Sequence, residues 1–219
     1  MIIMRTNGDV LPPDNPLIVN RISDCRLANA NNSTVLSYFA LTHLVIHRTD
    51  LDTLDPVANP HPVTNDNLDG PALAGRFADP ALGTGKLIPY HFLLRADTPH
   101  WTLEQILPLS LRGAHAIGYN YRSIGIAAVG DFRRYAPPLD QYAKLVKLVA
   151  ALVVINKGLI VAGHSDLPGA VGDSKKICPG AYLPVSVLAG QALASLPTNW
   201  MKWTNTEAQG WLVSAGVTI

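Results

Sequence analysis

Residues 123–158 limit the fold of this chain more strongly than any other segment. The run 123–129 reads Ser-Ile-Gly-Ile-Ala-Ala-Val, an apolar sequence typical of a strand that is buried on both faces. Prolines at 137 and 138 precede residues 139–156, where leucine, valine and isoleucine recur with the spacing of one helix face. Gly158 then follows as a helix terminator. A strand followed by a helix in this way indicates an α/β fold, in which helices pack on a central sheet.

Other parts of the chain continue this alternation of strands and helices. We expect strands at residues 41–47, 90–94, 101–106 and 159–163, a helix at 181–195, and a short helix within 71–82. Residues 50–69 contain so many turn-forming side chains that they are predicted to form a long surface loop, and such loops often carry function. The chain is therefore expected to build one central sheet.

Length and composition restrict the class of protein further. A chain of 219 residues with 48% apolar side chains can bury a core, which excludes a disordered chain. The net charge of +1 argues against a dedicated nucleic-acid-binding protein, which normally carries a basic excess. The longest apolar run, residues 148–155, is far shorter than the ~20 residues of a membrane-spanning helix. We therefore expect no nucleic-acid and no membrane partner, and the first residues show no signal-peptide pattern.

Two histidines and one cysteine stand where strand ends and an adjoining turn could bring them together. His47 ends the first expected strand, His164 follows the strand at 159–163, and Cys178 lies in the polar turn beyond it. Imidazole and thiolate are ligands that suit zinc, and a catalytic zinc site uses three protein ligands. His47 and His164 are 117 positions apart, so no local metal-binding motif exists. The residues alone equally allow two hydrogen-bonded histidines and a buried apolar cysteine.

Five short segments resemble those of one known family, in the same order along the chain. They are Val-Ile-His at 45–47, Ile-Pro-Tyr-His-Phe-Leu-Leu at 88–94, the stretch from Gly-Ala-His-Ala at 113–116 to Ser-Ile-Gly-Ile at 123–126, Gly-His-Ser-Asp at 163–166, and Lys-Ile-Cys-Pro-Gly at 176–180. Together they resemble the type-2 N-acetylmuramoyl-L-alanine amidases, a zinc family that includes small phage endolysins and the peptidoglycan recognition proteins. The resemblance implies an α/β fold with a single central mixed β-sheet flanked by helices.

The resemblance also implies roles for individual residues. His47, His164 and Cys178 lie where the family has its Zn²⁺ ligands. Tyr90 and Lys176 match its catalytic residues. His115 and Asn120 match residues that bind its substrate. Amide hydrolysis needs an activated water, a polarised carbonyl and a stabilised oxyanion. Zinc supplies the first two, and Lys176 or Tyr90 could supply the third. Which group acts as the general base stays open. The alternatives to a catalytic role are a ring packed in the core for Tyr90 and a solvated side chain for Lys176.

The chain departs from the family's pattern around two of the expected ligands. Arg48 follows the first histidine ligand, where many members have a second histidine or a small residue. Fourteen positions separate His164 from Cys178, a longer gap than in compact endolysins, and an inserted flexible loop is predicted between them. If Cys178 is not a ligand, two aspartates in this gap, Asp166 and Asp173, could replace it.

The resemblance implies hydrolysis of the amide between N-acetylmuramic acid and the L-alanine of the stem peptide in peptidoglycan. A chain without a signal peptide fits a phage or prophage endolysin, synthesised in the cytoplasm and released to the cell wall. It fits equally a cytoplasmic amidase that recycles soluble anhydro-muropeptides. Tyr90 and Cys178 favour the endolysin, because recycling enzymes tend to carry acidic residues at both positions.

Two further classes stay open as alternatives, a non-catalytic peptidoglycan-binding receptor and a zinc peptidase that cuts within the stem peptide. Cys178 disfavours the receptor, because loss of the cysteine ligand usually marks that class. A glycosidase would need two carboxylates that flank a sugar bond, and nothing in the chain singles out such a pair.

One amidase domain is expected over residues 1–219, with its core at about 40–195. Residues 1–39 are predicted to form an N-terminal extension of that domain. The tail at 196–219 holds three of the four tryptophans and is expected to pack on the domain rather than to bind sugar rings. Nothing in the residues suggests an interface between copies, so a monomer is expected.

Overall fold

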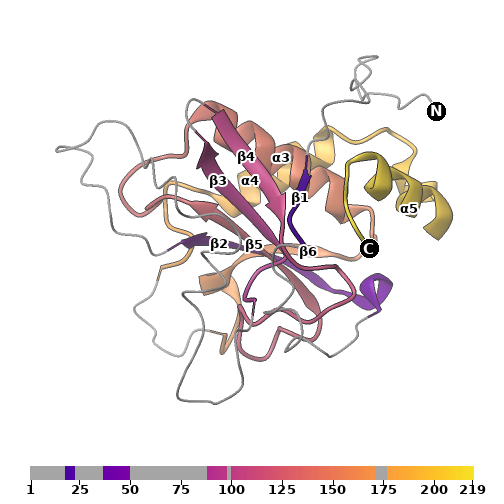
Figure 1. Cartoon of the computed structure of the whole chain (residues 1–219), viewed down its shortest axis with the longest axis horizontal. Coiled ribbons are helices and arrows are strands. Elements are labelled where there is room, and N and C mark those ends of the chain that lie inside the picture. The colour runs from indigo at the N-terminus through magenta and orange to yellow at the C-terminus, as the bar shows by residue number, and fades with distance from the viewer. Residues whose placement is uncertain (1–17, 23–36, 50–87, 98–99, 171–176) are drawn as a thin grey trace.

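The computed structural model describes residues 18–22, 37–49, 88–97, 100–170 and 177–219 (Figure 1). Within these residues the strands are β1 (Val19–Asn20), β2 (His43–Thr49), β3 (Phe92–Asp97), β4 (His100–Gln105), β5 (Ser123–Val129) and β6 (Ile160–Gly163). The helices are α3 (Leu139–Val153), α4 (Val185–Ala194) and α5 (Asn205–Ser214), with short 3₁₀ helices η1 (Tyr38–Ala40), η3 (His164–Asp166) and η4 (Trp200–Lys202). In the described part of the chain, no helix has the length and apolar character needed to cross a membrane.

The strands form one mixed sheet in the spatial order β1-β4-β3-β5-β2-β6. β3 and β4 are antiparallel, whereas the other neighbouring strands run parallel to each other. This arrangement confirms the expected single mixed sheet with flanking helices. β2 and β6 are neighbours with Ile46 opposite Gly163, so the carboxyl ends of these two strands lie together at one end of the sheet.

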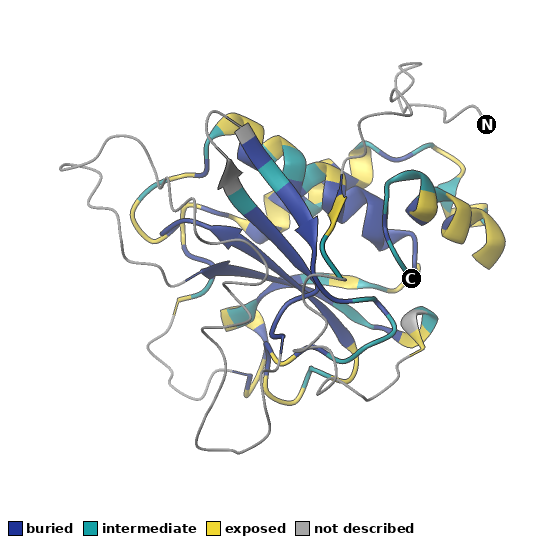
Figure 2. Ribbon diagram, in the orientation of Figure 1, coloured by how far each residue is buried: buried dark blue, intermediate teal, exposed yellow. Residues whose placement is uncertain are grey.

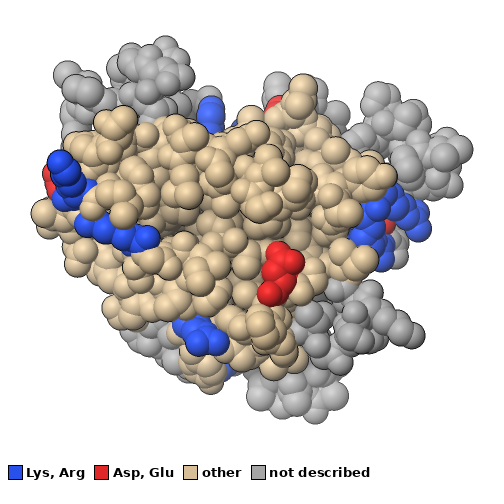
Figure 3. Space-filling model, turned by 180° about the vertical axis from the view of Figure 1, so that it is seen from behind, with Lys and Arg blue, Asp and Glu red and all other residues tan. Residues whose placement is uncertain are grey.

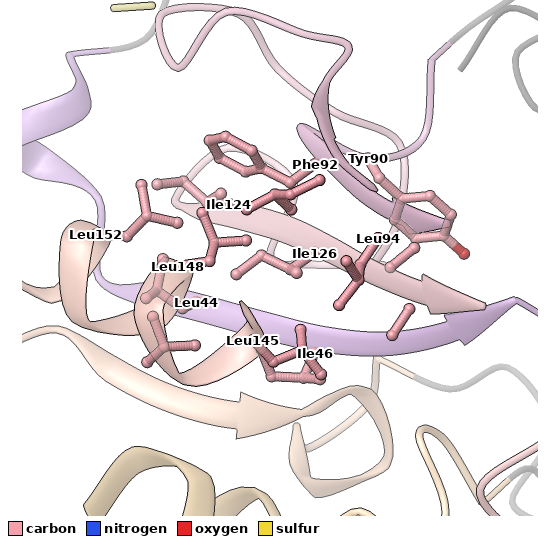
Figure 4. Close-up of a cluster of buried hydrophobic side chains, with 14 of the residues drawn as sticks. Leu44, Ile46, Tyr90, Phe92, Leu94, Ile124, Ile126, Leu145, Leu148 and Leu152 are labelled. Carbon is pink, nitrogen blue, oxygen red and sulfur yellow. The ribbon is translucent and has the colours of Figure 1, made fainter. Parts of the chain in front are cut away.

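The hydrophobic core lies between the sheet and α3. All of β5 is buried, as expected for its apolar sequence. Figure 4 shows Leu145, Leu148 and Leu152 of α3 directed at Ile124 and Ile126 of β5. Each such side chain stabilises the fold by roughly 1.5–3 kcal/mol relative to an exposed position. The opposite surfaces of the helices are exposed (Figure 2), so α3 has the amphipathic character that its sequence predicts.

Most element boundaries differ by one to three residues from those expected from the sequence. Helix α3 ends at Val153, three residues earlier than predicted. Helix α4 begins directly after Pro184 rather than at residue 181, since proline has no backbone N–H to donate into a helix that started one turn earlier. Strand β3 begins at Phe92, so Tyr90 precedes the strand instead of opening it. The loop expected at 50–69 and the helix expected within 71–82 lie outside the described residues.

The C-terminal segment contains a helix, α5, that the sequence analysis did not predict. It begins with a capping box, in which the Thr204 hydroxyl accepts from the Glu207 N–H and the Glu207 carboxylate accepts from the Thr204 N–H. Leu212 of α5 is fully buried in the main core. Gln105 of β4 binds both backbone groups of Thr218, donating to its carbonyl at 2.7 Å and accepting from its N–H at 2.6 Å. Three partly buried tryptophans pack against the same core: Trp200, Trp203 and Trp211.

Charged side chains are sparse on the face turned away from the view of Figure 1. Figure 3 shows Lys and Arg side chains there as small separate groups among uncharged residues. This distribution agrees with a chain in which only 15% of the residues are charged and the net charge is +1.

Candidate metal centre

The carboxyl ends of β2 and β6 bring two of the expected ligands together. His47 lies near the end of β2, and His164 is the first residue after β6, the parallel neighbour of β2. Cys178 comes from the segment that follows η3 and places its Sγ 3.9 Å from His47 Nδ1. One ligand atom from each of these three residues lies within 4.8 Å of the other two. His47 is buried, and His164 and Cys178 are half-buried.

A chain of hydrogen bonds determines which nitrogen of His47 faces this cluster. The Ser123 hydroxyl donates to the Tyr119 carbonyl at 2.7 Å, so its oxygen accepts from His115 Nε2 at 3.2 Å. His115 Nδ1 is therefore the unprotonated nitrogen and accepts from His47 Nε2, 3.0 Å away. His47 Nδ1 is left without a proton on the side of Cys178. A metal-binding histidine needs this tautomer, and a partner on its other nitrogen commonly fixes it.

Two neighbouring residues hold His115 in place. The Asn120 side-chain oxygen accepts from the backbone N–H groups of His115 and Ala116, at 2.8 and 2.7 Å. Gly125 of β5 makes room for the imidazole, because a Cβ added there would lie 2.7 Å from the His115 ring. His115 is buried and has both ring nitrogens bonded within the protein. The structure therefore shows His115 and Asn120 supporting His47, while contact of either with substrate stays a prediction.

The second histidine and the cysteine are also held by local hydrogen bonds. His164 Nε2 donates to the Ala170 carbonyl at 3.0 Å, which leaves Nδ1 as the nitrogen that can bind a metal. The Ser165 hydroxyl donates to the Cys178 carbonyl at 2.8 Å and accepts from the Cys178 N–H at 3.3 Å. The Ser165 N–H donates to that same carbonyl at 2.9 Å. Because Ser165 directly follows His164, these bonds fix two expected ligands relative to each other.

The aspartate alternative to Cys178 receives no support from the described residues. The Asp166 carboxylate accepts from the Gly163 N–H at 2.8 Å and caps η3. Among the described residues, the group that could hold a metal ion contains His47, His164 and Cys178 without an aspartate. Asp173, the other candidate, lies outside the described residues.

Burial and neighbouring imidazoles keep His47 and His115 neutral. Burial lowers the pKa of His47 well below its usual value, and the neighbouring His115 and His164 lower this pKa further. Burial also lowers the pKa of His115 well below its usual value, with a further lowering from His91 that the Ser123 contact opposes. At neutral pH these imidazoles are therefore uncharged, which is the form that binds a metal ion.

Of the two expected catalytic residues, the structure describes Tyr90 but not Lys176. The Tyr90 ring centroid is 5.0 Å from that of His47, and Tyr90 is 8% exposed. Figure 4 shows its ring at the edge of the apolar cluster with the hydroxyl directed away from it. Tyr90 therefore lies next to the candidate metal centre, and its chemical role remains a prediction. Lys176 lies outside the described residues, so its place and its role both remain predictions.

Sequence reasoning missed two residues that contact the site. Ser123 orients His115, although its sequence context indicates only a strand start within one of the family-like segments and no role at the site. Arg48 was noted as unusual without a role, and it binds the backbone on both sides of Cys178. The signal available for Arg48 was a charged residue directly after the apolar run Leu-Val-Ile and the expected ligand His47.

The donor set fits a zinc ion. It consists of two imidazoles, each with its other ring nitrogen hydrogen-bonded within the protein, and one thiol whose sulfur lies 3.9 Å from Nδ1 of the first imidazole. Two nitrogen ligands and one sulfur ligand match zinc, and three protein ligands are the number found in catalytic zinc sites. An arrangement of this kind defines a candidate zinc hydrolase centre at the end of a mixed sheet.

Comparison with known proteins identifies the family. A model of the N-acetylmuramoyl-L-alanine amidase family matches residues 38–181, which is more than half of the chain. The chain therefore belongs to the N-acetylmuramoyl-L-alanine amidase family, and the resemblance of its five segments is confirmed. The matched range includes all the residues of the candidate metal centre.

Individual relatives agree with this family. A peptidoglycan-recognition protein of Drosophila melanogaster is 30% identical over 99 residues, 44% of this chain and 50% of that protein. The match thus spans about half the length of this curated relative. The amidase LysC of Clostridium intestinale has 23% identity and a TM-score of 0.53, covering 81% of this chain and 97% of that one. The Ph2119 endolysin of a Thermus scotoductus bacteriophage has 20% identity and a TM-score of 0.57, covering 80% and 98%. Both structures show that the fold is shared.

Proposed function

We propose that this protein is a zinc-dependent N-acetylmuramoyl-L-alanine amidase, which hydrolyses the amide between N-acetylmuramic acid and L-alanine in peptidoglycan. The observation that carries the proposal is the cluster of His47, His164 and Cys178, whose ligand atoms lie within 4.8 Å of one another. A zinc ion held by these residues would supply Lewis-acid polarisation of the amide carbonyl and activation of a water molecule. Membership of the amidase family supports the choice of substrate bond.

The chain's own residues would bind the metal, orient its ligands and handle charge and protons. His115 and Ser123 keep His47 in the tautomer that a metal requires. The Tyr90 hydroxyl would donate a hydrogen bond to the carbonyl oxygen as negative charge develops on it, and Lys176 would add positive charge. Tyr90 Oη is also a proposed source of the proton that the leaving amine needs. His115 and Asn120 are proposed to border the bound substrate.

Among the members of this family, an endolysin fits the residues better than a recycling amidase for anhydro-muropeptides. Cys178 completes a His/His/Cys set, and Tyr90 lies beside His47, whereas recycling enzymes tend to carry acidic residues at both positions. The Ph2119 protein and LysC, which share the fold, are named as an endolysin and an amidase. We infer an enzyme that acts as a monomer on the cell wall.

A peptidoglycan-binding receptor is the second candidate, because the curated relatives are peptidoglycan-recognition proteins. A receptor would bind peptidoglycan and leave every covalent bond intact. The presence of Cys178 in the cluster favours the enzyme, because the receptors of this family usually lack that ligand.

The proposal is tested by removing one ligand. Cys178→Ser is expected to lose bound zinc, and release of soluble fragments from purified peptidoglycan should fall by roughly 100-fold or more. This estimate follows because loss of a residue that only supports a ligand already costs about 10–100-fold. Metal analysis and fragment release measure the two effects. Cys25→Ser removes the chain's other cysteine and serves as the matched control, with zinc and activity retained. Full zinc content in Cys178→Ser would refute the assignment.

A further inference from the structure

Arg48 is a buried cation directly after the first expected metal ligand. It belongs to β2, pairs with Ala128 of β5 in the sheet register, and is 5% exposed. A guanidinium is costly to bury without charged or hydrogen-bonding partners. Its burial in β2 therefore requires partners that compensate for the lost hydration.

Those partners lie on both sides of Cys178. Arg48 Nη1 donates to the carbonyl of Ile177 and, at 3.2 Å, to the carbonyl of Pro179. Its Nε lies 3.8 Å from the Asp131 carboxylate, which supplies the opposite charge. The planar guanidinium can bind several acceptors at once in a fixed geometry, which a lysine ammonium cannot reproduce. Arg48 thus connects the end of β2 to the Cys178 segment and to Asp131, which lies two residues beyond β5.

Cys178 needs such an anchor more than the two histidines do. His47 is fixed by the sheet, and His164 directly follows β6. Cys178 is fourteen positions beyond His164, so the chain between them does not by itself determine where the sulfur lies. Ser165 binds the backbone of Cys178 itself, and Arg48 binds the carbonyls before and after it.

We propose that Arg48 is a positioning residue that holds the Cys178 sulfur against His47, so that the third metal ligand is set in place before the metal binds. This inference rests on the proposed metal centre. It explains why a charged residue occupies a buried position of β2.

Cobalt(II) is the probe for this proposal, because a cobalt–thiolate bond produces a charge-transfer absorption that reports on the sulfur ligand alone. Arg48→Met has a similar length but no donors, and is expected to weaken metal affinity by roughly tenfold or more and to reduce this absorption. Arg134→Gln is the matched control. The Arg134 side chain is exposed and contacts the same Asp131 at 3.4 Å, so its loss should leave affinity and absorption unchanged.

Three outcomes separate this inference from the proposed function. If wild type shows the absorption and folded Arg48→Met binds cobalt within about twofold of the wild-type affinity, the role of Arg48 is overturned. The proposed metal centre is then unaffected. Wild-type protein without the absorption overturns the metal centre and this inference with it. If Arg48→Met does not fold, Arg48→Lys takes its place, because one ammonium cannot bind both carbonyls and Asp131 in the same geometry. Weaker cobalt binding by folded Arg48→Lys supports the proposal, and unchanged binding overturns it.

Discussion

His47 has one ring nitrogen bonded to His115 and the other 3.9 Å from the Cys178 sulfur. The proton on the first nitrogen is accounted for by Ser123, whose hydroxyl is committed to the Tyr119 carbonyl. A residue outside the His47, His164 and Cys178 cluster therefore controls the protonation of a proposed metal ligand. Supporting groups of this kind raise the basicity of the ligand and fix its orientation.

Substitution of His115 tests this chain of hydrogen bonds. In His115→Ala, His47 Nε2 has no acceptor, and metal affinity is expected to fall by about 10–100-fold, the usual effect of removing such a partner. His115→Asn places an amide oxygen near the position of Nδ1 and should retain more of the affinity. Zinc dissociation constants measured by competition with a chelator would distinguish the two variants. Equal affinity in wild type and His115→Ala would show that the contact does not orient His47.

Tyr90 is tested by removing only its hydroxyl. Tyr90→Phe keeps the ring that packs at the edge of the core, so folding and zinc content should match wild type. Loss of one hydrogen bond to a developing oxyanion costs roughly 100-fold in turnover or more. Steady-state hydrolysis of a soluble muropeptide measures this effect. An unchanged turnover number would assign Tyr90 to packing alone.

At the level of elements, His91 links the start of β3 to its neighbours. Its Nδ1 accepts from the Gly125 N–H of β5 at 3.1 Å, and its Nε2 donates to the Leu111 carbonyl at 2.9 Å. Burial lowers the pKa of His91 to about 4, against the opposing effect of the Leu111 carbonyl. The folded protein therefore keeps His91 neutral where the unfolded chain, with a pKa near 6.5, binds a proton.

The stability of the protein should consequently fall as the pH is lowered from about 6.5 to about 4. Above pH 6.5 His91 contributes fully to the free energy of unfolding. About 3 kcal/mol of this contribution is lost by pH 4, because the unfolded state binds more protons than the folded state over this range. The free energy of unfolding, measured by denaturant titration with a chelator present, would show the slope. His91→Asn can still accept from Gly125 and should show a smaller slope. Parallel pH profiles for the two proteins would rule out His91 as a source of the slope.

Most elements could be predicted from local sequence patterns. β5 has the predicted bounds, and β2, β4, β6 and α3 agree within a few residues, because buried strands and an amphipathic helix have strong apolar patterns. Helix α5 was missed, although Thr204 and Glu207 form a recognisable capping box, since its apolar face is narrow. The two residues of β1 are too few to give a pattern of their own.

The candidate metal centre could be predicted less well from residue patterns alone. His47 and His164 come together because β2 and β6 are adjacent parallel strands, a pairing that no local pattern reveals. The resemblance to the amidases supplied this set, and the structure brings its three members together. Ser123 and Arg48 could not be found in this way, because their contacts depend on side-chain directions across strands and loops distant in sequence.

At the scale of the molecule, one hydrophobic core joins the sheet and the C-terminal segment. Leu212 and Val217 of the C-terminal segment belong to the same buried cluster as Ile124 and Ile126 of β5. The candidate metal centre lies at the end of the sheet, where β2 and β6 end and Cys178 approaches His47. A rigid core next to the site is what a preorganised hydrolase requires, because its ligands must keep their geometry without substrate.

Mass spectrometry of the products formed from purified peptidoglycan tests the proposed amidase most directly. With zinc present, the expected products are free stem peptides that begin with L-alanine, together with glycan strands without peptides, and both should be absent when a chelator is added. Intact peptidoglycan combined with cleavage of soluble anhydro-muropeptides would indicate the recycling enzyme instead. Stem peptides cut at an internal bond, or no products from any substrate in the presence of zinc, would contradict an amidase.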